Sequence, residues 1–379
     1  MPAKPIALVA SLVLAGAVWA APPAKGSKQQ AKPAAAKTAA AKTAEKPLAP
    51  LPADVKPGWS HGPYEAGDCS ICHQKNDRRD PGPVSVKGND LCFGCHEEFR
   101  EIMGRKFRHA AATDACVNCH NPHNSAERKL LRHEQTALCF ECHDDIRAVA
   151  QNSKVKHAAL TTGSKCAGCH NPHAANVEKL LVLLPFDLCL SCHGQEGLKD
   201  EQGVVLANMK RWLQDNKVWH GPIQGKDCSS CHRTHGADHF RLLSADYPPK
   251  FYAPYESKNY ELCFGCHDER AMAAAETNAL TGFRDGKRNL HYLHVNKSDR
   301  GRTCRACHEV HASHQSHHIR DGVPYGPKGW ILKLNYQKTA NGGSCAKTCH
   351  DTKTYARDGG APGKASRGPR PPASQARRP

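Results

Sequence analysis

Over most of its length this chain has no continuous apolar run that could span a bilayer as a helix. The exception is an apolar run at 6–20, about 15 residues, which is shorter than the roughly 20 residues of a membrane-spanning helix. The run follows Lys4 and ends in Val18-Trp19-Ala20, so residues 1–20 are predicted to be a secretory signal peptide cleaved after Ala20. An uncleaved membrane anchor is the alternative. No alternation typical of barrel strands occurs elsewhere.

Composition adds to this picture. Pro (26) and Gly (30) are frequent, aromatic residues make up 6%, and the apolar 39% includes twenty Cys and many Ala. Leu, Ile, Val and Phe normally fill a protein core, and this chain is poor in them. We therefore expect mostly coil with short α-helices and almost no β-structure, around an interior that something other than side chains must fill.

Charge and low complexity divide the chain. The net charge is +17, of which residues 21–57 and residues 351–379 carry +5 each. The first segment is predicted to be an Ala/Lys/Pro-rich flexible linker and the second a disordered basic tail, with a folded body at 58–350 between them. The linker could space the body from a membrane or cell wall, or be a plain solvated leader. No aromatic-basic recognition module accompanies the positive charge, so no nucleic-acid partner is expected.

The body repeats one unit five times. Each unit has a His seven to ten positions before a C-x-x-C-H motif, often a further His three residues after that motif, and a second C-x-x-C-H usually introduced by Leu. The five repeats are predicted at about 58–105, 106–153, 154–215, 216–290 and 291–350.

The cysteines occur only as ten pairs, each followed by His. The pairs are Cys69/Cys72, Cys92/Cys95, Cys116/Cys119, Cys139/Cys142, Cys166/Cys169, Cys189/Cys192, Cys228/Cys231, Cys263/Cys266, Cys304/Cys307 and Cys345/Cys349. In an exported protein so many cysteines would first suggest disulfides, but disulfides do not require a His after every pair. Zinc needs further ligands at other spacings to complete a tetrahedron. C-x-x-C-H is the attachment motif of haem c.

This spacing suits haem because two thiols three positions apart can bond to the two vinyl groups on one porphyrin edge. The next residue, a neutral His, then reaches the iron. The expected cofactors are ten covalent haem c groups, and the predicted proximal ligands are His73, His96, His120, His143, His170, His193, His232, His267, His308 and His350. The tenth motif has one extra residue, and a disulfide there is the alternative.

The second axial ligand decides whether an iron has an open position. Repeat position proposes nine distal ligands, which are His61, His109, His157, His220 and His294 before the motifs and His123, His173, His235 and His311 after them. Three residues span at most about 10–11 Å, less than the roughly 12 Å between trans ligand backbones. A His at plus three must therefore serve a neighbouring haem.

Repeat one departs from the pattern, because Asn76 stands at its plus-three position. His133 and His291 lead the candidates for the tenth distal ligand, and we take His133. The remaining candidates are His239, His314, His317 and His318. Met103 and Met272 follow second motifs and are expected to pack on helices. A missing tenth ligand would leave one haem open.

The paired array, with CHNPH at 119–123 and 169–173 and Leu-Cys-x-x-Cys-His at 91–96, 138–143, 188–193 and 262–267, resembles the doubled-CXXCH multihaem cytochromes c. The resemblance implies a core of stacked bis-His haems and little regular secondary structure. It also implies electron transfer in anaerobic respiration or extracellular metal exchange, in the periplasm or at the cell surface. The implied partners are other redox proteins, periplasmic or outer-membrane cytochromes, and in some relatives a β-barrel porin.

An electron carrier with no catalytic residues is therefore the leading hypothesis. The alternatives are a multihaem reductase of the nitrite, hydroxylamine or sulfur-oxyanion type with one open haem, and a subunit of a cytochrome filament or other haem-to-haem oligomer. Such reductases often replace one proximal His, whereas all ten motifs here keep it.

The motif count predicts ten haems per chain. A pyridine haemochrome assay, referred to protein mass, should return that number because each Cys pair and its His attach one group. A result of eight or fewer would contradict the count.

Overall fold

The structure is a computed structural model that describes residues 58–200, 202–326, 329–345 and 349–360. The expected signal peptide, the linker and most of the basic tail lie outside the described residues. The described part belongs to one compact unit, Leu51–Pro379. Within it, no helix is long and apolar enough to cross a membrane.

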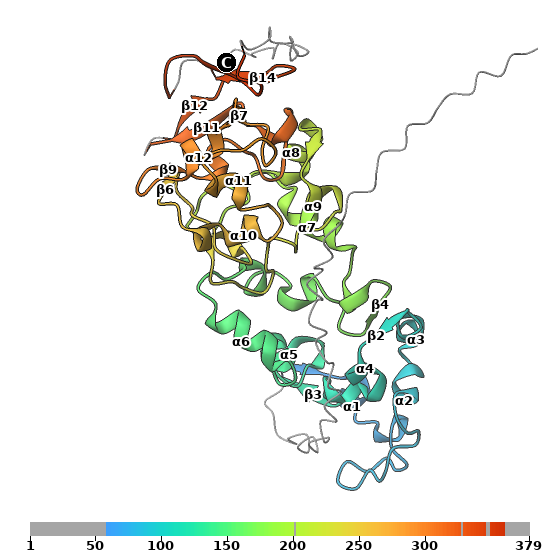
Figure 1. The fold of residues 1–379 in the computed structure, drawn as a ribbon. Helices are drawn as coiled ribbons and strands as arrows, with labels where there is room; N and C mark the ends of the chain where they lie inside the picture. Colours follow the sequence, from blue (N-terminus) through green and yellow to red (C-terminus); the bar gives the residue numbers. More distant parts are fainter. Residues whose placement is uncertain (1–57, 201, 327–328, 346–348, 361–379) are drawn as a thin grey trace, which may run out of the picture. The chain divides into compact units, whose positions relative to one another are not determined.

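The α-helices are short, between four and nine residues (Figure 1). They are α1 (Gly62–Glu65), α2 (Asp90–Phe93), α3 (Glu97–Met103), α4 (Ala110–Asp114), α5 (Gln135–Phe140), α6 (Asp144–Asn152), α7 (Pro185–His193), α8 (Met209–Asp215), α9 (Gly221–Gln224), α10 (Glu261–Phe264), α11 (Arg270–Ala273) and α12 (Leu290–Val295). Met103 and Met272 lie in α3 and α11.

Short 3-10 helices carry most of the first motifs and the turns after them. They are η1 (Cys69–Ile71), η2 (Cys116–Asn118), η3 (Arg128–Leu130), η4 (Ala158–Leu160), η5 (Lys165–Gly168), η6 (Glu178–Leu180), η7 (Phe240–Leu242), η8 (Ser257–Tyr260), η9 (Cys304–Ala306) and η10 (Ser316–His318). The second motifs of repeats one to four begin instead within α2, α5, α7 and α10.

The expectation of almost no β-structure was wrong. The described residues hold β1 (Trp59–Ser60), β2 (Phe107–Arg108), β3 (Asn124–Ser125), β4 (Ala174–Ala175), β5 (Val218–Trp219), β6 (Tyr252–Ala253), β7 (Arg284–Asp285), β8 (Arg288–Asn289), β9 (Gly301–Arg302), β10 (Ala312–Ser313), β11 (Gly322–Tyr325), β12 (Trp330–Lys333), β13 (Tyr336–Lys338), β14 (Gly342–Cys345) and β15 (Lys353–Ala356). Most are two-residue ladders, which are too short to show an alternating pattern in sequence.

Several of these ladders join one repeat to the next. β1 pairs with β3, β2 with β4 and β5 with β10, all antiparallel. Repeats three and four are joined at the same place by the bridge between Val155 and Ala237. In each case the strand before a repeat's first His meets the strand after the next repeat's plus-three His. The strands therefore set the spacing of the array.

A left-handed turn closes the first half of repeats two to five. Lys129 and Leu130 have φ values of 59° and 55°, and Lys179/Leu180, Arg241/Leu242 and His317/His318 repeat this conformation. A non-glycine residue in this region costs about 1–2 kcal/mol. Such strain persists only where the surrounding structure holds the backbone in place. Here the carbonyl group of the first left-handed residue points to a proximal His.

Few large side chains are buried in the described residues. Tyr260 and Asn289 are the largest that are fully buried, and half of the other buried apolar residues are Ala. One small cluster, Leu213, Ile223 and Ala312, packs against Phe186 and Trp219. The side chains thus supply little of the core that a chain of this length needs.

The region after repeat five's first motif is built differently. β11 and β12 form a hairpin. β13, β14 and β15 form a three-stranded antiparallel sheet, and its central strand, β14, ends at Cys345. The sheet contacts β7, where the Gly286 amide donates to the Ala356 carbonyl at 2.8 Å. The unusual tenth motif therefore starts from a strand.

The sheet predicts a sensitive glycine. A Cβ on Gly342 would lie 1.9 Å from the Tyr355 carbonyl oxygen, whereas one on Gly62 would meet nothing within 4 Å. G342A should lower the free energy of unfolding by about 2 kcal/mol or more, in the range of severe backbone clashes. G62A should change it by less than about 0.5 kcal/mol. Thermal unfolding of both variants measures this, and equal melting temperatures would contradict it.

Candidate metal centres formed by histidine pairs

Nine histidine pairs face each other ring to ring. Their centroids are 6.1–6.4 Å apart and their planes differ by 8–25°. The pairs are His73–His123, His96–His61, His120–His173, His143–His109, His170–His235, His193–His157, His232–His311, His267–His220 and His308–His291. Every pair joins a histidine of a C-x-x-C-H motif to one outside the motifs.

The separation fits an iron between the two rings. A histidine nitrogen lies about 2.0 Å from a bound first-row metal, and about 1.1 Å from its own ring centre, so two trans imidazoles place their centroids about 6.2 Å apart. Ordinary aromatic contacts also have centroids about 4.5–7 Å apart, so it is the recurrence of one narrow separation at nine proximal histidines that points to ligation. The observed range therefore matches ligation.

Hydrogen bonds fix the tautomer that ligation needs. Nδ1 of His73, His120, His170, His232 and His308 lies 2.7–3.0 Å from the carbonyl oxygen nine residues further on. That carbonyl belongs to the left-handed turn, or to Gly82 in repeat one. Because a carbonyl only accepts, Nδ1 must carry the proton, and Nε2 is left with its lone pair. Such partners orient metal ligands and raise their basicity.

In three pairs that contain the His opening a repeat, this distal histidine makes the hydrogen bond. His61, His109 and His157 place Nδ1 2.9–3.0 Å from the carbonyl oxygens of Pro122, Pro172 and Thr234. Each of these carbonyls precedes the plus-three His of the next repeat. The inter-repeat ladder thus positions both histidines at once.

Burial also favours the neutral, ligating form. Desolvation lowers the pKa of His291 and of His311 to about 4, and it lowers the pKa of His109, His157 and His193 as well. These imidazoles are uncharged at neutral pH, the state in which a nitrogen can bind iron.

The pairs follow a simple rule. We number the sites 1 to 10 in the order of their motifs. Sites 2, 4, 6 and 8 pair with the His that opens their own repeat, as His96 does with His61. Sites 1, 3, 5 and 7 pair with the plus-three His of the next repeat, as His73 does with His123. No plus-three His faces the proximal His of its own motif.

Site 9 has no following repeat, and His291 faces its proximal His308 at 6.3 Å. Asn289 caps α12 by accepting from the His291 and Tyr292 amides, while its side-chain amide donates to the carbonyls of Ala271 and Ala274. Nδ1 of His291 meets the Thr281 hydroxyl at 3.0 Å. The start of α12 therefore positions this ring.

His133, our sequence-based choice for the tenth ligand, lies elsewhere. Its Nε2 is 3.4 Å from a Glu141 carboxylate oxygen on the surface, and the structure places no proximal ring opposite it. His133 ends the turn beside site 3, where His173 already faces His120. The sequence could not separate His133 from His291, because both lie outside the repeat pattern.

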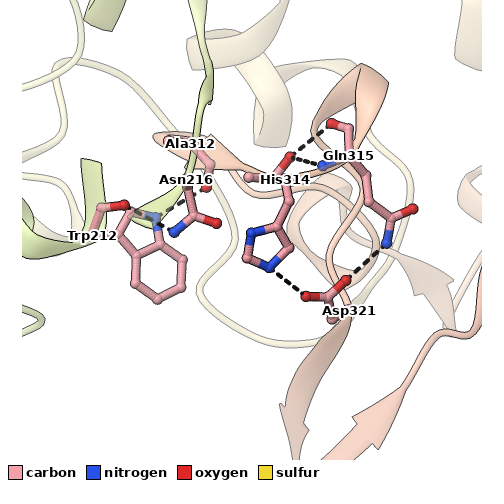
Figure 2. Close-up of polar contacts among 7 residues, drawn as sticks. Trp212, Asn216, Ala312, His314, Gln315 and Asp321 are labelled. Atoms are coloured by element: carbon pink, nitrogen blue, oxygen red, sulfur yellow. Dashed lines mark hydrogen bonds and ion pairs between the residues drawn. The ribbon is translucent and has the colours of Figure 1, made fainter. Parts of the chain in front are cut away.

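The remaining spare histidines also have other contacts. His239 lies 3.0 Å from Asp246, and His314 lies 2.8 Å from Asp321, which also accepts from Gln315 (Figure 2). The His317 carbonyl accepts from His308, and the His318 ring meets His220 edge-on at 5.4 Å.

Site 10 combines α12 with the C-terminal sheet. His294, one turn after His291, places Nδ1 2.7 Å from the Leu290 carbonyl, and Phe283 stacks on it at 5.7 Å. Desolvation by burial is the largest cause that lowers the pKa of His294. Nδ1 of His350 contacts the Asp351 carbonyl at 2.6 Å.

The cysteines form no disulfide, and all twenty lie in the described part of the chain. Eight of them form four thiol–thiol hydrogen bonds across repeat boundaries, Cys116 with Cys92, Cys139 with Cys166, Cys228 with Cys189 and Cys304 with Cys263. The hydrogen bond from Cys139 lowers the pKa of Cys166 to about 6. The last site of one repeat thus touches the first site of the next.

Five of the predicted attachment cysteines are exposed, although a cofactor that fills the interior would be expected to enclose its attachment points. Each is the second cysteine of its repeat's second motif, and they are Cys95, Cys142, Cys192, Cys266 and Cys349. The first four lie at or just beyond the ends of α2, α5, α7 and α10, and none of these helices has a buried residue. These helices lie on the surface, so the thiols at their ends face solvent. The other fifteen cysteines are partly buried.

Reasoning from sequence missed the turn that supports the proximal His. Its signal is a basic residue and two Leu, as Lys129-Leu130-Leu131, Lys179-Leu180-Leu181 and Arg241-Leu242-Leu243, nine to eleven residues after the proximal His. The repeat therefore extends beyond the motif and the plus-three His, although repeat five has His317-His318-Ile319 there.

Comparison with known proteins agrees with this arrangement. The family described as Doubled CXXCH motif matches residues 61–101, 109–148, 157–197 and 220–272, which are repeats one to four. The multiheme cytochrome MtrA of Shewanella baltica (strain OS185) is 29% identical over 76 residues, which are 19% of this chain and 23% of that protein. The alignment thus spans under a quarter of the relative. The matched segments carry the motifs and pairs described above, and over these segments the chain is similar to the doubled CXXCH multihaem c-type cytochromes.

Proposed function

We propose that this protein is an electron carrier that binds ten haem c groups, each between two histidines, and passes electrons along them. The nine facing pairs carry this proposal, since an iron with two imidazoles has no open position for a substrate. Haem, when bound, supplies the redox centre. The chain supplies two thioether sulfurs and two oriented imidazoles at each site.

The proposed distal ligands are the nine given by repeat position, with His291 as the tenth in place of His133. His291 and His294, both on α12, would then serve sites 9 and 10. This assignment explains Asn76. A plus-three His serves the preceding repeat, and repeat one has no predecessor. The Asn76 side chain instead accepts from the Cys69 amide at 2.9 Å.

Contacts between sulfurs support a continuous path. Besides the four contacts across repeat boundaries, the pKa of the second thiol of each first motif is affected by cysteines of the second motif in its own repeat. Cys119 is affected by Cys142, and Cys307 by Cys345 and Cys349. Since the two sulfurs of each pair would hold one haem, neighbouring sites in motif order, from site 1 to site 10, would lie close enough to pass electrons from one to the next.

The setting is also a proposal. The predicted signal peptide and the likeness to a multiheme cytochrome support export, and with it a role in anaerobic respiration or extracellular electron exchange. Partners would be other redox proteins of the periplasm or outer membrane. A reductase would need a proximal His with no facing ring, and nine of the ten proximal histidines in the described residues have one.

Low-temperature EPR of the oxidised protein tests the proposal. We expect low-spin signals with essentially no high-spin component, because two nitrogen ligands complete each iron. Carbon monoxide should not bind the reduced protein at neutral pH. A high-spin signal from one full haem, with nitrite or carbon monoxide binding, would favour the reductase.

Two matched variants test the tenth ligand. H291A should convert one haem in ten to a high-spin form, because site 9 would lose its distal ring. H133A should leave the spectrum unchanged, since His133 contacts only a surface carboxylate in the structure. Haem content, measured in parallel, should stay equal. The reverse pattern, with high-spin haem in H133A alone, would restore His133 as the ligand.

A further inference from the structure

Two of the paired histidines have a carboxylate beside Nδ1 in the described part of the chain. At site 2, Oε1 of Glu98 lies 3.7 Å from Nδ1 of His96. At site 7, Oε1 of Glu309 lies 3.8 Å from Nδ1 of His311. The Glu98 side chain is 62% exposed, whereas that of Glu309 is 10% exposed. The two contacts therefore match in atoms and distance and differ in burial.

The place of Glu309 in the repeat is held by Asn elsewhere. Glu309 directly follows the proximal histidine of its motif, and Asn121 and Asn171 stand there in repeats two and three. Each Asn side chain accepts from the backbone amide of its plus-three His, at 3.1 and 3.0 Å. Glu309 accepts instead from the Val310 amide at 3.0 Å and lies beside the His311 ring. Repeat five thus has a charged group where repeats two and three have a neutral one.

A buried salt bridge holds this carboxylate. Nη2 of Arg320 lies 2.8 Å from Oε2 of Glu309, and both side chains are 10% exposed. Nε of Arg320 donates to the His308 carbonyl at 2.9 Å, which fixes the guanidinium to the backbone. A charge that is buried without a partner is unfavourable. Arg320 therefore allows Glu309 to stay charged beside His311.

The charges around His311 have both signs. Desolvation by burial is the largest cause that lowers the pKa of His311, and the positive charges of Arg305 and Arg320 act in the same direction. Glu309 opposes these two arginines. Because buried charges are screened less than exposed ones, Glu309 should act on its histidine more strongly than Glu98 does.

The consequence for site 7 rests on the proposed function, in which His311 is the distal ligand of a haem. A ferric site carries one more positive charge than a ferrous site, so a carboxylate beside the ligand stabilises the ferric state. Groups that contact the ligands of a metal, and the burial of the site, are means by which a protein tunes a haem.

We propose that the buried carboxylate of Glu309, held by Arg320, lowers the reduction potential of the site 7 haem through His311. The step affected is the transfer of one electron from a reduced neighbouring site to the oxidised site 7. No bond forms or breaks in this step, and no proton moves. Site 7 would then hold its electron less tightly than it would with a neutral side chain at position 309.

Redox titration of the full, haem-loaded chain at neutral pH, followed by haem absorbance, tests this. E309Q removes the charge and keeps the shape, and it should raise the equilibrium constant for reducing one haem in ten about tenfold, which is about 59 mV. E309N, which introduces the residue of repeats two and three, should differ from E309D in the same direction. The control E98Q removes the exposed carboxylate at site 2 and should shift no haem by more than about twofold.

A variant of the distal ligand assigns the shift to site 7. H311A should make that haem high-spin, so that it is distinguished from the low-spin haems during the titration. E309Q in this background should leave the low-spin titration unchanged. A low-spin haem that still shifts would place the effect at another site and overturn the proposal.

Haem count and spin state separate the other outcomes. Fewer than ten haems in the wild type would overturn the proposed function itself. Ten low-spin haems in E309Q and E309N, with unchanged titrations, would overturn only the role of Glu309. An equal shift in E98Q would also overturn it, since burial would then not be the cause. Loss of a haem in both E309Q and E309N would assign Glu309 to building the site rather than tuning it, and this too would overturn the proposal.

Discussion

The architecture depends on a limit of reach. A histidine three residues beyond a proximal histidine is too close along the chain to come round to the opposite side of the same iron. In the structure His123 faces His73 of the preceding repeat, and His173, His235 and His311 behave alike. Each repeat is therefore completed by its successor, and the short ladders such as β1–β3 hold the two in register.

This dependence explains why so small a side-chain core suffices. Nearly half of the apolar residues buried in the described part are Ala, and two adjacent residues in left-handed conformation recur in four repeats. Neither feature suits a fold that stands on side-chain packing alone. Both suit a chain that wraps prosthetic groups, because the strained turn gives the proximal imidazole of the first motif in repeats two to five its carbonyl partner, and Ala allows close approach. Folding and haem attachment would then be coupled, as in small metal-dependent domains.

Much of the site could be read from the sequence, and the reasons for the rest are physical. Motif spacing predicted the cysteines and proximal histidines, and repeat position gave nine distal candidates, eight of which the structure brings to a proximal ring. His291 could not be told from His133, because its placement depends on the Asn289 cap of α12 and on contacts far along the chain. The exposure of thiols such as Cys95, Cys192 and Cys266 was not foreseen, because it depends on which helices lie at the surface. The two-residue strands were missed because they are too short to show an alternating apolar pattern.

The ends of the array are as informative as its middle. Residues 1–57 and 351–379 contain no C-x-x-C-H motif, and in the two repeats beside them Asn76 replaces the plus-three His and α12 supplies His291. A unit inserted between these ends would take one ligand from the unit after it and give one to the unit before it. Gene duplication could therefore lengthen or shorten such a conductor by whole units without leaving any iron short of a ligand, provided that the two terminal units are kept.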